Sequence, residues 1–422
     1  MLRLWQYTDL HLCVRENQEE LQFNPGQTAL QESEEIIDAC LAVFLAASDC
    51  NTLLLGGDLT QDGHPDEHRS MIRKLNAVQA AGKRVIAITA SHDYRTIKKE
   101  NSRLLREMYA PFGIRDAVAK YEDGLAFVVQ ISDGLRLLCI NDHGREPVWL
   151  SWAVEQVRQA RAAGDDIFGM AHLPSLPPSP VYPFISPGSM LAGYQETTRA
   201  LADAGLRFIV TGHSHMHNIA PIVTPAGNPY WDINTSALVG MPGLFRQLDF
   251  EGNHVRITSR EIPHVPIFGD LSAREYLQNK FNAVLNNLFD GLDHDYDLFL
   301  RSVRVGTNPE AFNKIKWILK PAGRVLCRIT LGGFGRLLWC GHKIPKDARK
   351  RRLRDVLQET MRNMYAGEEP YGPETGVGKA MLAYGRRLKF LGKKIGVDDF
   401  SEFLLSVVYD DTPDGEVVIP LN

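Results

Sequence analysis

Short apolar runs alternate with longer amphipathic stretches through about the first 260 residues of the chain. Each short run has the length of a β-strand, and each longer stretch repeats apolar residues at helical spacing. Helices between the early strands, followed by consecutive strands, predict an α/β fold of two stacked mixed sheets flanked by helices. The expected strands are 2–8, 52–56, 84–90, 125–131, 135–141, 166–171, 207–211, 219–223, 230–234, 245–250 and 255–261. The expected helices are 28–49, 65–82, 98–110, 149–163 and 194–204.

The pattern changes after about residue 268, where helical spacing dominates. Ser272 is placed to cap a helix through REYLQNKFNAVLNNLFDGL, and EVVIPL predicts a short final strand. Because 422 residues are many for one hydrophobic core, we expect a first domain at 1–267 and a mostly helical accessory domain at 268–422. Further helices are expected near 309–319, 350–365, 375–395 and 399–408.

Polar clusters follow five of the predicted strands directly. Open α/β sheets gather their active sites at strand ends, so these five loops are expected to share one site. Each motif alone is also common in turns or around structural histidines, and only the ordered set indicates a metal centre. The clusters are TDLHL with Asp9 and His11, GGDLTQDG with Asp58, ASHDY with Ser91, His92 and Asp93, MAHLP with His172, and GHSH with His213 and His215.

The donor types of these clusters indicate transition metals. Mixed imidazole and carboxylate ligands suit Zn, Mn or Fe, whereas an all-oxygen set would suit Mg or Ca. If Asp9 and His11 continue their strand, alternation turns both side chains to one face, where they can hold one ion. Asp58 is a lone carboxylate that can bridge two cations. Two ions roughly 3.5–4 Å apart can bind both the attacking and the leaving oxygen of a phosphoryl transfer.

The ordered motifs resemble those of the calcineurin-like metallophosphoesterase superfamily over residues 1 to about 262. GDLTQDG is similar to the bacterial cyclic-nucleotide-phosphodiesterase-like branch, as are CINDHGREPVWLSWAVEQV and WDINTSAL. The resemblance implies a four-layer αββα sandwich and two metal ions. The ligands it implies are Asp9, His11 and His215 for the first metal, Asp58 as the bridge, and His172 and His213 for the second metal.

The resemblance also implies roles for the ASHDY cluster. His92 matches a histidine that contacts the substrate phosphate and protonates the leaving oxygen, and Asp93 matches the carboxylate that orients it. Ser91 departs from the pattern, because the family has Asn there as a ligand of the second metal. A serine hydroxyl is a shorter and weaker ligand than an amide carbonyl, so we expect weaker occupancy of the second site.

The activity implied is metal-dependent phosphoester hydrolysis, with a phosphodiester as the first choice of substrate. A hydroxide held between the ions would attack phosphorus in line with the leaving oxygen. The alternatives are a nuclease-type or phosphomonoesterase member of the same superfamily, or a non-enzymatic scaffold in whose favour only Ser91 stands.

A Pro-rich stretch, LPSLPPSPVYPFISPG, follows His172. Pro is excluded from helix interiors and central strands, so we expect irregular structure here. Because His172 ties one end to the predicted centre, the stretch is expected to form a rim loop that affects substrate choice, with a plain connecting loop as the alternative. His64, His68, His143 and His217 adjoin other predicted site loops and are expected to support the ligands or face solvent.

Composition limits which cellular compartment and which classes of partner are expected. The net charge of −4 gives no overall bias toward nucleic acid. Six scattered Cys without CxxC spacing are expected to be reduced core residues. No signal peptide and no 18-residue apolar run are recognised, so we expect a cytoplasmic protein without a transmembrane segment.

One C-terminal segment, 317–354, combines Trp, Leu and Phe with many Arg and Lys and almost no acid. One interpretation is a surface that contacts anionic lipid or nucleic acid. The other is a packed helical pair whose basic face is solvated, or a cap over the active site that attracts phosphate.

Overall fold

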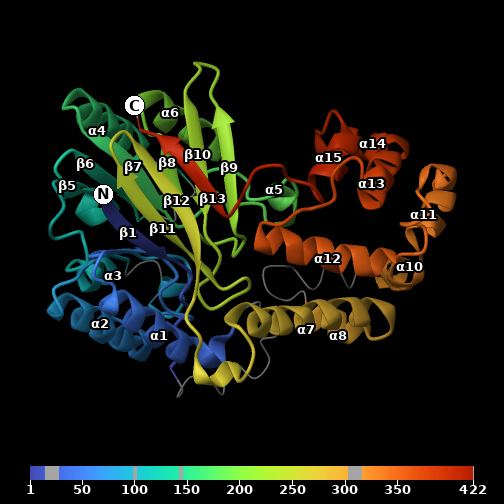
Figure 1. Ribbon diagram of the computed structural model, residues 1–422, viewed down its shortest axis with the longest axis horizontal. Helices are drawn as coiled ribbons and strands as arrows, with labels where there is room; N and C mark the ends of the chain where they lie inside the picture. Colours follow the sequence, from blue (N-terminus) through green and yellow to red (C-terminus); the bar gives the residue numbers. More distant parts are fainter. Residues whose placement is uncertain (15–27, 98–101, 142–145, 303–315, 422) are drawn as a thin grey trace.

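Two mixed β-sheets pack face to face, and helices cover both outer sides (Figure 1). The computed structural model describes residues 1–14, 28–97, 102–141, 146–302 and 316–421. The strand order of the first sheet is β13 (Glu416–Pro420), β12 (His254–Glu261), β11 (Leu244–Glu251), β1 (Leu2–Tyr7), β2 (Thr52–Gly56) and β3 (Arg84–Ile88). The order of the second is β4 (Ala119–Tyr121), β5 (Ala126–Ser132), β6 (Leu135–Ile140), β7 (Asp166–Ala171), β8 (Phe208–Thr211), β10 (Pro229–Asn234) and β9 (Asn218–Val223).

Each sheet contains one block of parallel strands; the block reaches the edge of the first sheet and lies inside the second, and the other strands are antiparallel. β1, β2 and β3 are parallel, as are β6, β7, β8 and β10. Strands buried on both faces need continuous apolar runs, and β2 has every residue buried. The carboxyl ends of the parallel strands therefore lie at one edge of the sandwich, where the polar loops follow.

Three apolar cores hold the four layers together. Leu54, Phe168 and Leu248 belong to the core between the sheets. Helices α1 (Ser33–Ala46), α2 (Pro65–Ala80) and α3 (Ser102–Tyr109) cover the first sheet, and α4 (Leu150–Ala162) and α6 (Tyr194–Ala204) cover the second. This architecture confirms the predicted four-layer sandwich.

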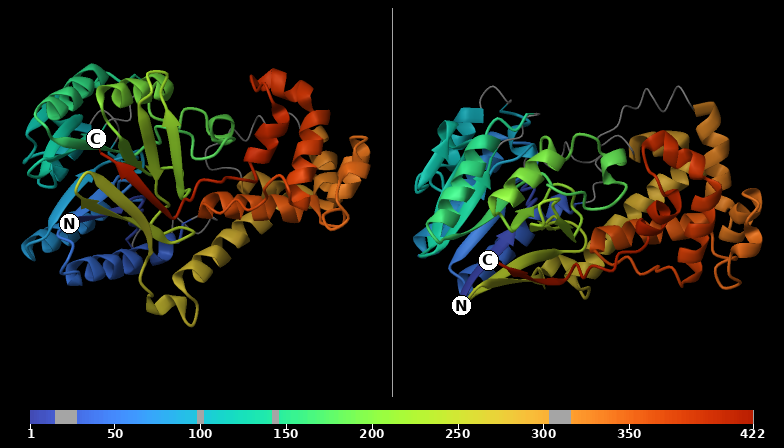
Figure 2. Two further views of the ribbon diagram at one scale, coloured as in Figure 1. Left: turned by 45° about the horizontal axis from the view of Figure 1, so that its top comes forward. Right: turned by 90° about the horizontal axis from the view of Figure 1, so that it is seen from above.

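The remaining helices form an arm that extends to one side of the sandwich (Figures 1 and 2). Ser272 accepts a hydrogen bond from the Glu275 amide and caps the first of these helices, as predicted. The last strand, β13, returns to the first sheet and pairs with β12. The helical arm comprises α7 (Ala273–Asp293), α8 (Tyr296–Ser302), α10 (Lys316–Arg328), α11 (Leu331–Leu337), α12 (Leu353–Ala366), α13 (Gly376–Arg387), α14 (Lys389–Ile395) and α15 (Phe400–Ser406).

The sequence-based elements agree with the structure except at a few short segments. Every strand expected before residue 268 is present, but β4, α8, α11 and most of α10 were not expected. Part of the helix expected at 309–319 lies outside the described residues. The Pro-rich stretch contains one helical turn, α5 (Tyr182–Ile185), which the prediction of irregular structure excluded. Pro183 is tolerated there because the first helical turn needs no amide donor.

Within the described residues, no helix is both long enough and apolar enough to cross a membrane. All six cysteines are free and buried. Burial raises the pKa of Cys13, the one beside the polar loops, to about 12, which makes that thiol unreactive at neutral pH.

Buried polar groups join the arm to the sandwich. Fully buried Arg246 donates to the carbonyl oxygen of Asp414 at 2.6 Å, and the Asp414 carboxylate accepts from the Ile219 amide at 2.6 Å. The neighbouring Glu369 is buried beside Asp414 and Asp410. Burial and these two carboxylates raise the pKa of Glu369 to about 8, so its folded form is protonated at neutral pH.

We expect thermal stability to fall as the pH rises from about 5 to 8, with Glu369 as one cause. A glutamate in an unfolded chain loses its proton at a pH of about 4.3, whereas folded Glu369 keeps its proton to about pH 8. The stability that this group contributes is therefore fully present below the unfolded pKa and is lost toward the folded one, by at most about 1.4 kcal/mol per pH unit. Glu369→Gln, which stays neutral, should flatten the slope of melting temperature against pH. The exposed control Glu402→Gln should leave the slope unchanged, and an unchanged slope in Glu369→Gln would contradict the assignment.

Candidate metal centre

Loops at the carboxyl ends of five parallel strands bring the predicted site residues together. Asp9 and His11 follow β1, Asp58 follows β2, and His92 follows β3. His172 follows β7, and the loop of His213 and His215 follows β8. Both sheets thus contribute to one site, as expected for strand-end loops.

Left-handed backbone, rather than strand alternation, aims the side chains. β1 ends at Tyr7, and Asp9 and His11 have φ of 52° and 43°. The prediction that alternation within a strand aligns these two residues is therefore wrong. The segment is still held against its neighbour, because the amides of Asp9 and His11 donate to the carbonyls of Gly57 and Asp58.

The same conformation recurs at three further site residues. Asp58, His213 and His215 have φ of 48°, 66° and 59°. Non-Gly residues rarely adopt positive φ, and such strained backbone concentrates at functional sites. Its recurrence at Asp9, His11, Asp58, His213 and His215 marks this edge as functional independently of any motif.

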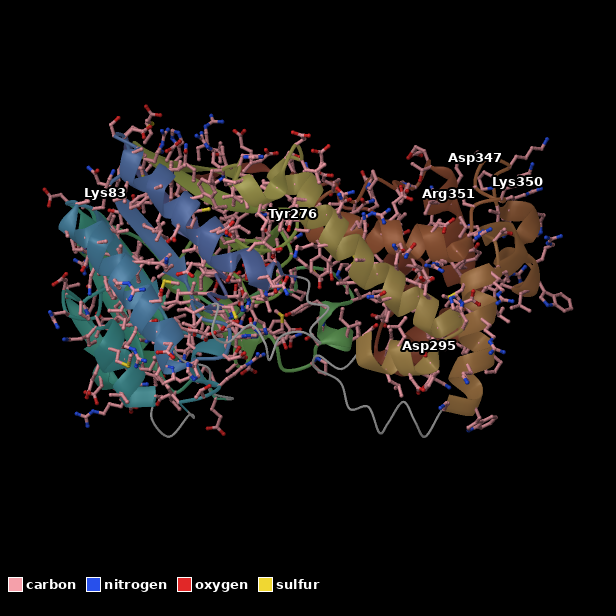
Figure 3. All side chains as sticks on the ribbon, turned by 90° about the horizontal axis from the view of Figure 1, so that it is seen from below. Lys83, Tyr276, Asp295, Asp347, Lys350 and Arg351 are labelled. Carbon is pink, nitrogen blue, oxygen red and sulfur yellow. The ribbon has the colours of Figure 1, made fainter. Side chains whose placement is uncertain are left out.

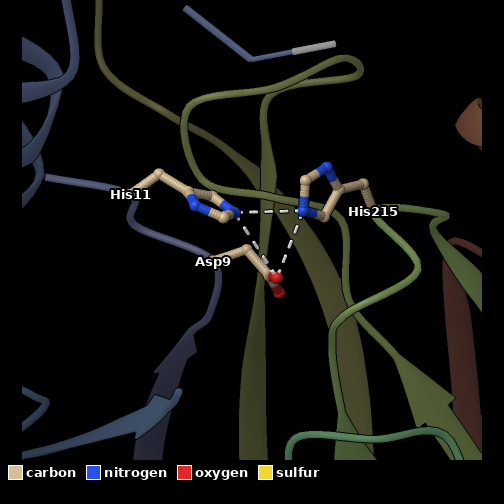
Figure 4. Close-up of side chains that lie close together, drawn as sticks. All are labelled: Asp9, His11 and His215. Atoms are coloured by element: carbon tan, nitrogen blue, oxygen red, sulfur yellow. Dashed lines mark hydrogen bonds and ion pairs between the residues drawn. The ribbon is translucent and has the colours of Figure 1, made fainter. Parts of the chain in front are cut away.

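Asp9, His11 and His215 form the first group of converging side chains (Figure 4). Asp9 Oδ1 lies 3.2 Å from His215 Nε2 and 3.8 Å from His11 Nε2. The two imidazole nitrogens are 3.1 Å apart. The other oxygen, Asp9 Oδ2, is occupied by hydrogen bonds from the Thr8 hydroxyl and the His213 amide. Only Oδ1 therefore remains for a ligand.

Asp58, His172 and His213 form the second group. Asp58 Oδ2 lies 3.1 Å from His172 Nε2, which in turn lies 3.2 Å from His213 Nδ1. Asp58 Oδ1 accepts the His92 amide at 2.8 Å. His172 Nδ1 donates to the Gly56 carbonyl at 2.9 Å, which orients the ring so that Nε2 faces Asp58 and His213.

The donor set fits two cations. In each group two imidazole nitrogens face each other, at 3.1 Å for His11 and His215 and at 3.2 Å for His172 and His213. Two lone pairs at this distance repel each other unless a proton or a metal ion lies between them. Asp9 Oδ1 is buried without a hydrogen bond, an unfavourable state that a bound ion would relieve. Asp58 also groups with His11 and His92, so this carboxylate lies between the two clusters.

The electrostatics of the buried groups support this arrangement. Burial would raise the pKa of Asp9, but the imidazoles of His172 and His215 hold it below the usual range. Burial, with nearby His172, lowers the pKa of His213 to about 3, so its ring is neutral. Burial would lower the pKa of His172, but Asp58 and Asp9 raise it to about 9, so this ring must lose a proton to bind a metal. Neutral imidazole and ionised carboxylate are the protonation states that bind metals.

His92 and Asp93 lie on a short 3₁₀ turn, His92–Tyr94, beyond β3. The Asp93 carboxylate accepts hydrogen bonds from the backbone of Thr60 and Ala90 and does not reach the His92 ring in this structure. The Gln61 carbonyl, 2.6 Å from His92 Nδ1, holds the ring in the place expected for Asp93. Asp93 instead ties the β2 loop to the β3 loop.

Ser91 precedes this turn and is exposed to solvent. The four other metal-ligand loops direct buried or half-buried side chains inward, whereas Ser91 has a short side chain at the surface. This placement agrees with a weak contribution to any metal. Whether Ser91 is a ligand stays a prediction.

Supporting residues hold the GHSH loop in place. The Asn234 side chain donates to the Gly212 carbonyl at 2.8 Å and accepts from Ser214 Oγ. A Cβ on Gly212 would lie 2.4 Å from Asp9 Oδ2, so only glycine fits between the two ligand loops. The motif WDINTSAL had indicated the strand that carries Asn234 but not its contacts.

Two histidines expected to support the site do so through buried contacts. His68 contacts the Tyr109 hydroxyl and the Asp93 carbonyl, and His217 contacts Ser259 Oγ at 2.7 Å. His64 caps α2, and His143 lies outside the described residues.

Arg95 was not identified from the sequence. Its Nη2 lies 2.8 Å from His92 Nε2, and its Nη1 donates to Asp62 at 2.9 Å. The sequence signal for Arg95 was a basic residue three positions after His92 in ASHDYR. Such a spacing is too common to identify a functional residue. The structure places an exposed guanidinium at the mouth of the centre.

Comparisons with known proteins agree with the fold and the motifs. A family model described as calcineurin-like phosphoesterase matches residues 2–217, a range that includes every predicted site residue. No curated protein matches the chain.

Several solved structures are similar to part of the chain. A dimetal phosphatase from Danio rerio is 11% identical with a TM-score of 0.47, covering 62% of this chain and 97% of that one. A purple acid phosphatase from yellow lupin (Lupinus luteus) is 11% identical with a TM-score of 0.42, covering 62% of this chain and 51% of that one. A phosphopantetheinyl hydrolase from Mycobacterium tuberculosis is 14% identical with a TM-score of 0.30, covering 56% and 89%.

We predict that the two metal sites differ in affinity because of Ser91. Calorimetric titration of the metal-free protein with Mn²⁺ should show one tight and one weak site. Ser91→Asn should tighten the weak site by about 1–2 kcal/mol, the scale of one improved polar contact to a charged centre. The remote exposed control Ser151→Asn should change neither site. Two equally tight sites in the unaltered protein would contradict the prediction.

Proposed function

The chain belongs to the calcineurin-like phosphoesterase family, and from this premise we propose that it hydrolyses phosphodiesters at a dinuclear metal centre. The chain is a hydrolase of phosphoric esters by family. The preference for diesters over monoesters is the proposal, and it rests on the GDLTQDG motif and its resemblance to phosphodiesterases.

The convergence of facing imidazole pairs on Asp9 and Asp58 is the observation that carries the proposal. Asp9, His11 and His215 would hold one ion, His172 and His213 the other, and Asp58 both. Their nitrogen and oxygen donors suit Mn, Fe or Zn. When bound, two such ions lower the pKa of a water nucleophile and neutralise the charge that develops on the phosphoryl oxygens.

The protein side chains around the centre position the substrate. His92 Nδ1 donates to Gln61, which leaves Nε2 as an acceptor for Arg95. Arg95 is exposed, so it is free to turn toward an entering phosphate and pair with its oxygens. That movement would release His92 Nε2, which, once protonated, could donate to the leaving oxygen. Asp93 keeps the two loops at a fixed separation while this happens.

We also propose that the two parts of the chain have different roles. Residues 1–267 contain all the predicted chemistry, and residues 268–422 form an accessory region whose last strand joins the first sheet. The end of α12 contacts the site loop directly, because the His217 amide donates to the Tyr365 carbonyl at 3.1 Å. The arm is therefore placed to influence access to the centre.

Asp58→Ala should abolish hydrolysis of an aryl phosphodiester such as bis(4-nitrophenyl) phosphate in Mn²⁺. Loss of a ligand common to both ions removes several kcal/mol of transition-state stabilisation, so we expect at least about a hundredfold fall in kcat/KM. The exposed control Asp133→Ala should retain full activity. A parallel screen of aryl monoesters and cyclic nucleotides tests the diester preference. Wild-type-like turnover by Asp58→Ala would exclude the dinuclear centre.

Arg95→Ala should raise KM for the same diester about tenfold or more, because a paired guanidinium contributes on the order of 1.5–3 kcal/mol to anion binding. Arg95→Lys should restore part of the loss, since the charge returns without the planar fork. Steady-state kinetics at saturating Mn²⁺ separate KM from kcat. An unchanged KM in Arg95→Ala would show that the guanidinium does not meet the phosphate.

A further inference from the structure

The far part of the helical arm carries a dense positive charge. Segment 317–354 has 11 Lys and Arg against a single acid, Asp347, although the whole chain has a net charge of −4. Figure 3 shows Asp347, Lys350 and Arg351 together on the arm, far from Lys83 on the sandwich. The charge is therefore separated from the main body.

Part of this charge serves the fold of the arm. Arg349 donates to the Ile344 carbonyl at 2.7 Å, Arg351 pairs with Glu359, and Arg354 pairs with Asp290 at 2.7 Å. In the run 349–352, the densest in the sequence, Arg349 and Arg351 make internal contacts, whereas Lys350 and Arg352 are exposed. A contact surface must be sought among the exposed side chains instead.

Trp339 is the most exposed large apolar side chain of the described residues, at 83%. It follows the end of α11, at the position where helices commonly place glycine because the backbone turns left-handed. Its φ is 61°, a conformation that is unfavourable for a bulky side chain. Arg387 fixes this backbone by donating to the Trp339 carbonyl at 3.1 Å.

The left-handed turn at Trp339 ends α11, and the Cys340 amide after it donates to the Gly335 carbonyl as Cys340 enters the core of the arm. The exposed indole itself takes no part in that core. Backbone outliers such as this turn persist only where the surroundings enforce them, and they concentrate at functional positions. Leu337, two residues earlier, is 62% exposed and lies on the same short helix. Arg336 and Lys343 are exposed on either side of this pair along the chain.

Helix α14 adds a second exposed basic and apolar segment next to the first. Arg387, which holds Trp339, is followed directly by α14, where Phe390 is 54% exposed and Ile395 is 41% exposed. The hydrogen bond from Arg387 to the Trp339 carbonyl links the two segments, and we call their exposed side chains together the tip surface. Its members are Arg336, Leu337, Trp339, Lys343, Lys389, Phe390, Lys393, Lys394 and Ile395.

We propose that the tip surface binds the headgroup region of an anionic lipid bilayer. Trp and Phe lie favourably at the membrane interface, and exposed Lys and Arg pair with anionic headgroups. Peripheral binding of this kind needs both apolar insertion and basic attraction, and the tip surface supplies both.

Lipid fits the tip surface better than nucleic acid does. Phosphate backbones are contacted by charged and polar groups, and bases stack on aromatic rings. Neither contact uses Leu337 or Ile395, which would stay exposed to water on a nucleic acid but enter the interface of a bilayer. Since the arm is anchored at His217, beside His215, binding at the tip would also fix the position of the metal centre relative to the bilayer.

Co-sedimentation of the full-length protein with vesicles tests the proposal. Vesicles of phosphatidylcholine with 30% phosphatidylglycerol are the probe, and pure phosphatidylcholine is the comparison. We expect binding to the anionic vesicles only, weakened at least tenfold between low and high salt. Trp339→Gly removes the indole at a position that suits glycine, so it should keep or raise the melting temperature while reducing vesicle binding at least tenfold.

Charge variants and nucleic acid complete the test. Lys343→Glu with Lys393→Glu should abolish binding, whereas Lys120→Glu with Arg158→Glu, the same charge change on exposed sandwich positions, should not. Equal loss in both double variants would mean non-specific attraction and overturn the proposal. So would absence of binding to anionic vesicles, or tighter, Trp339-dependent binding to RNA or DNA. Because hydrolysis is not measured, each of these outcomes leaves the proposed phosphoesterase activity untouched.

Discussion

The site depends on two buried carboxylates, and the surrounding backbone and hydroxyl donors bind only one oxygen of each. Asp9 and Asp58 each use one oxygen for amide or hydroxyl donors of the protein and direct the other toward imidazole nitrogens. A buried charge is tolerated only when it is paired or bound to a metal. The arrangement is therefore stable as a receptor for cations, and the loops around it are constrained to keep the geometry.

Those constraints extend into both sheets. Positive φ at five predicted ligand positions costs conformational energy, which the flanking parallel strands offset through their buried apolar cores. Gly212 has no room for a Cβ between the ligand loops, and Asn234 fixes the loop beyond it. The apolar interior thus serves to hold a strained polar edge.

The arm is coupled to the sandwich by buried apolar and polar contacts, since Leu277 and Phe281 of α7 belong to its core and Met364 of α12 packs with Met216. The end of α12 meets the GHSH loop at His217, and Arg246 and Asp414 tie the return of the chain to the sandwich. At its other end the arm exposes the Trp339 side chain on a left-handed backbone. One element therefore links a surface suited to an external partner with the loop that carries two of the predicted ligands.

The sequence by itself determined the sandwich and the identity of the clustered residues. Apolar runs report burial locally, and the order of the five polar motifs is readable without coordinates, so β1 to β3 and Asp9, Asp58 and His172 could be placed in advance. Tertiary structure decided what depends on contacts between distant segments. The side chains of Asp9 and His11 are oriented by left-handed turns and not by strand alternation. The His92 ring is hydrogen-bonded to the Gln61 carbonyl and not to Asp93. Tertiary structure also brought Arg95 to His92, and it showed Arg349 and Arg351 to be structural while Trp339 is exposed. Backbone strain and side-chain pairing arise from three-dimensional packing, which residue spacing along a chain does not encode.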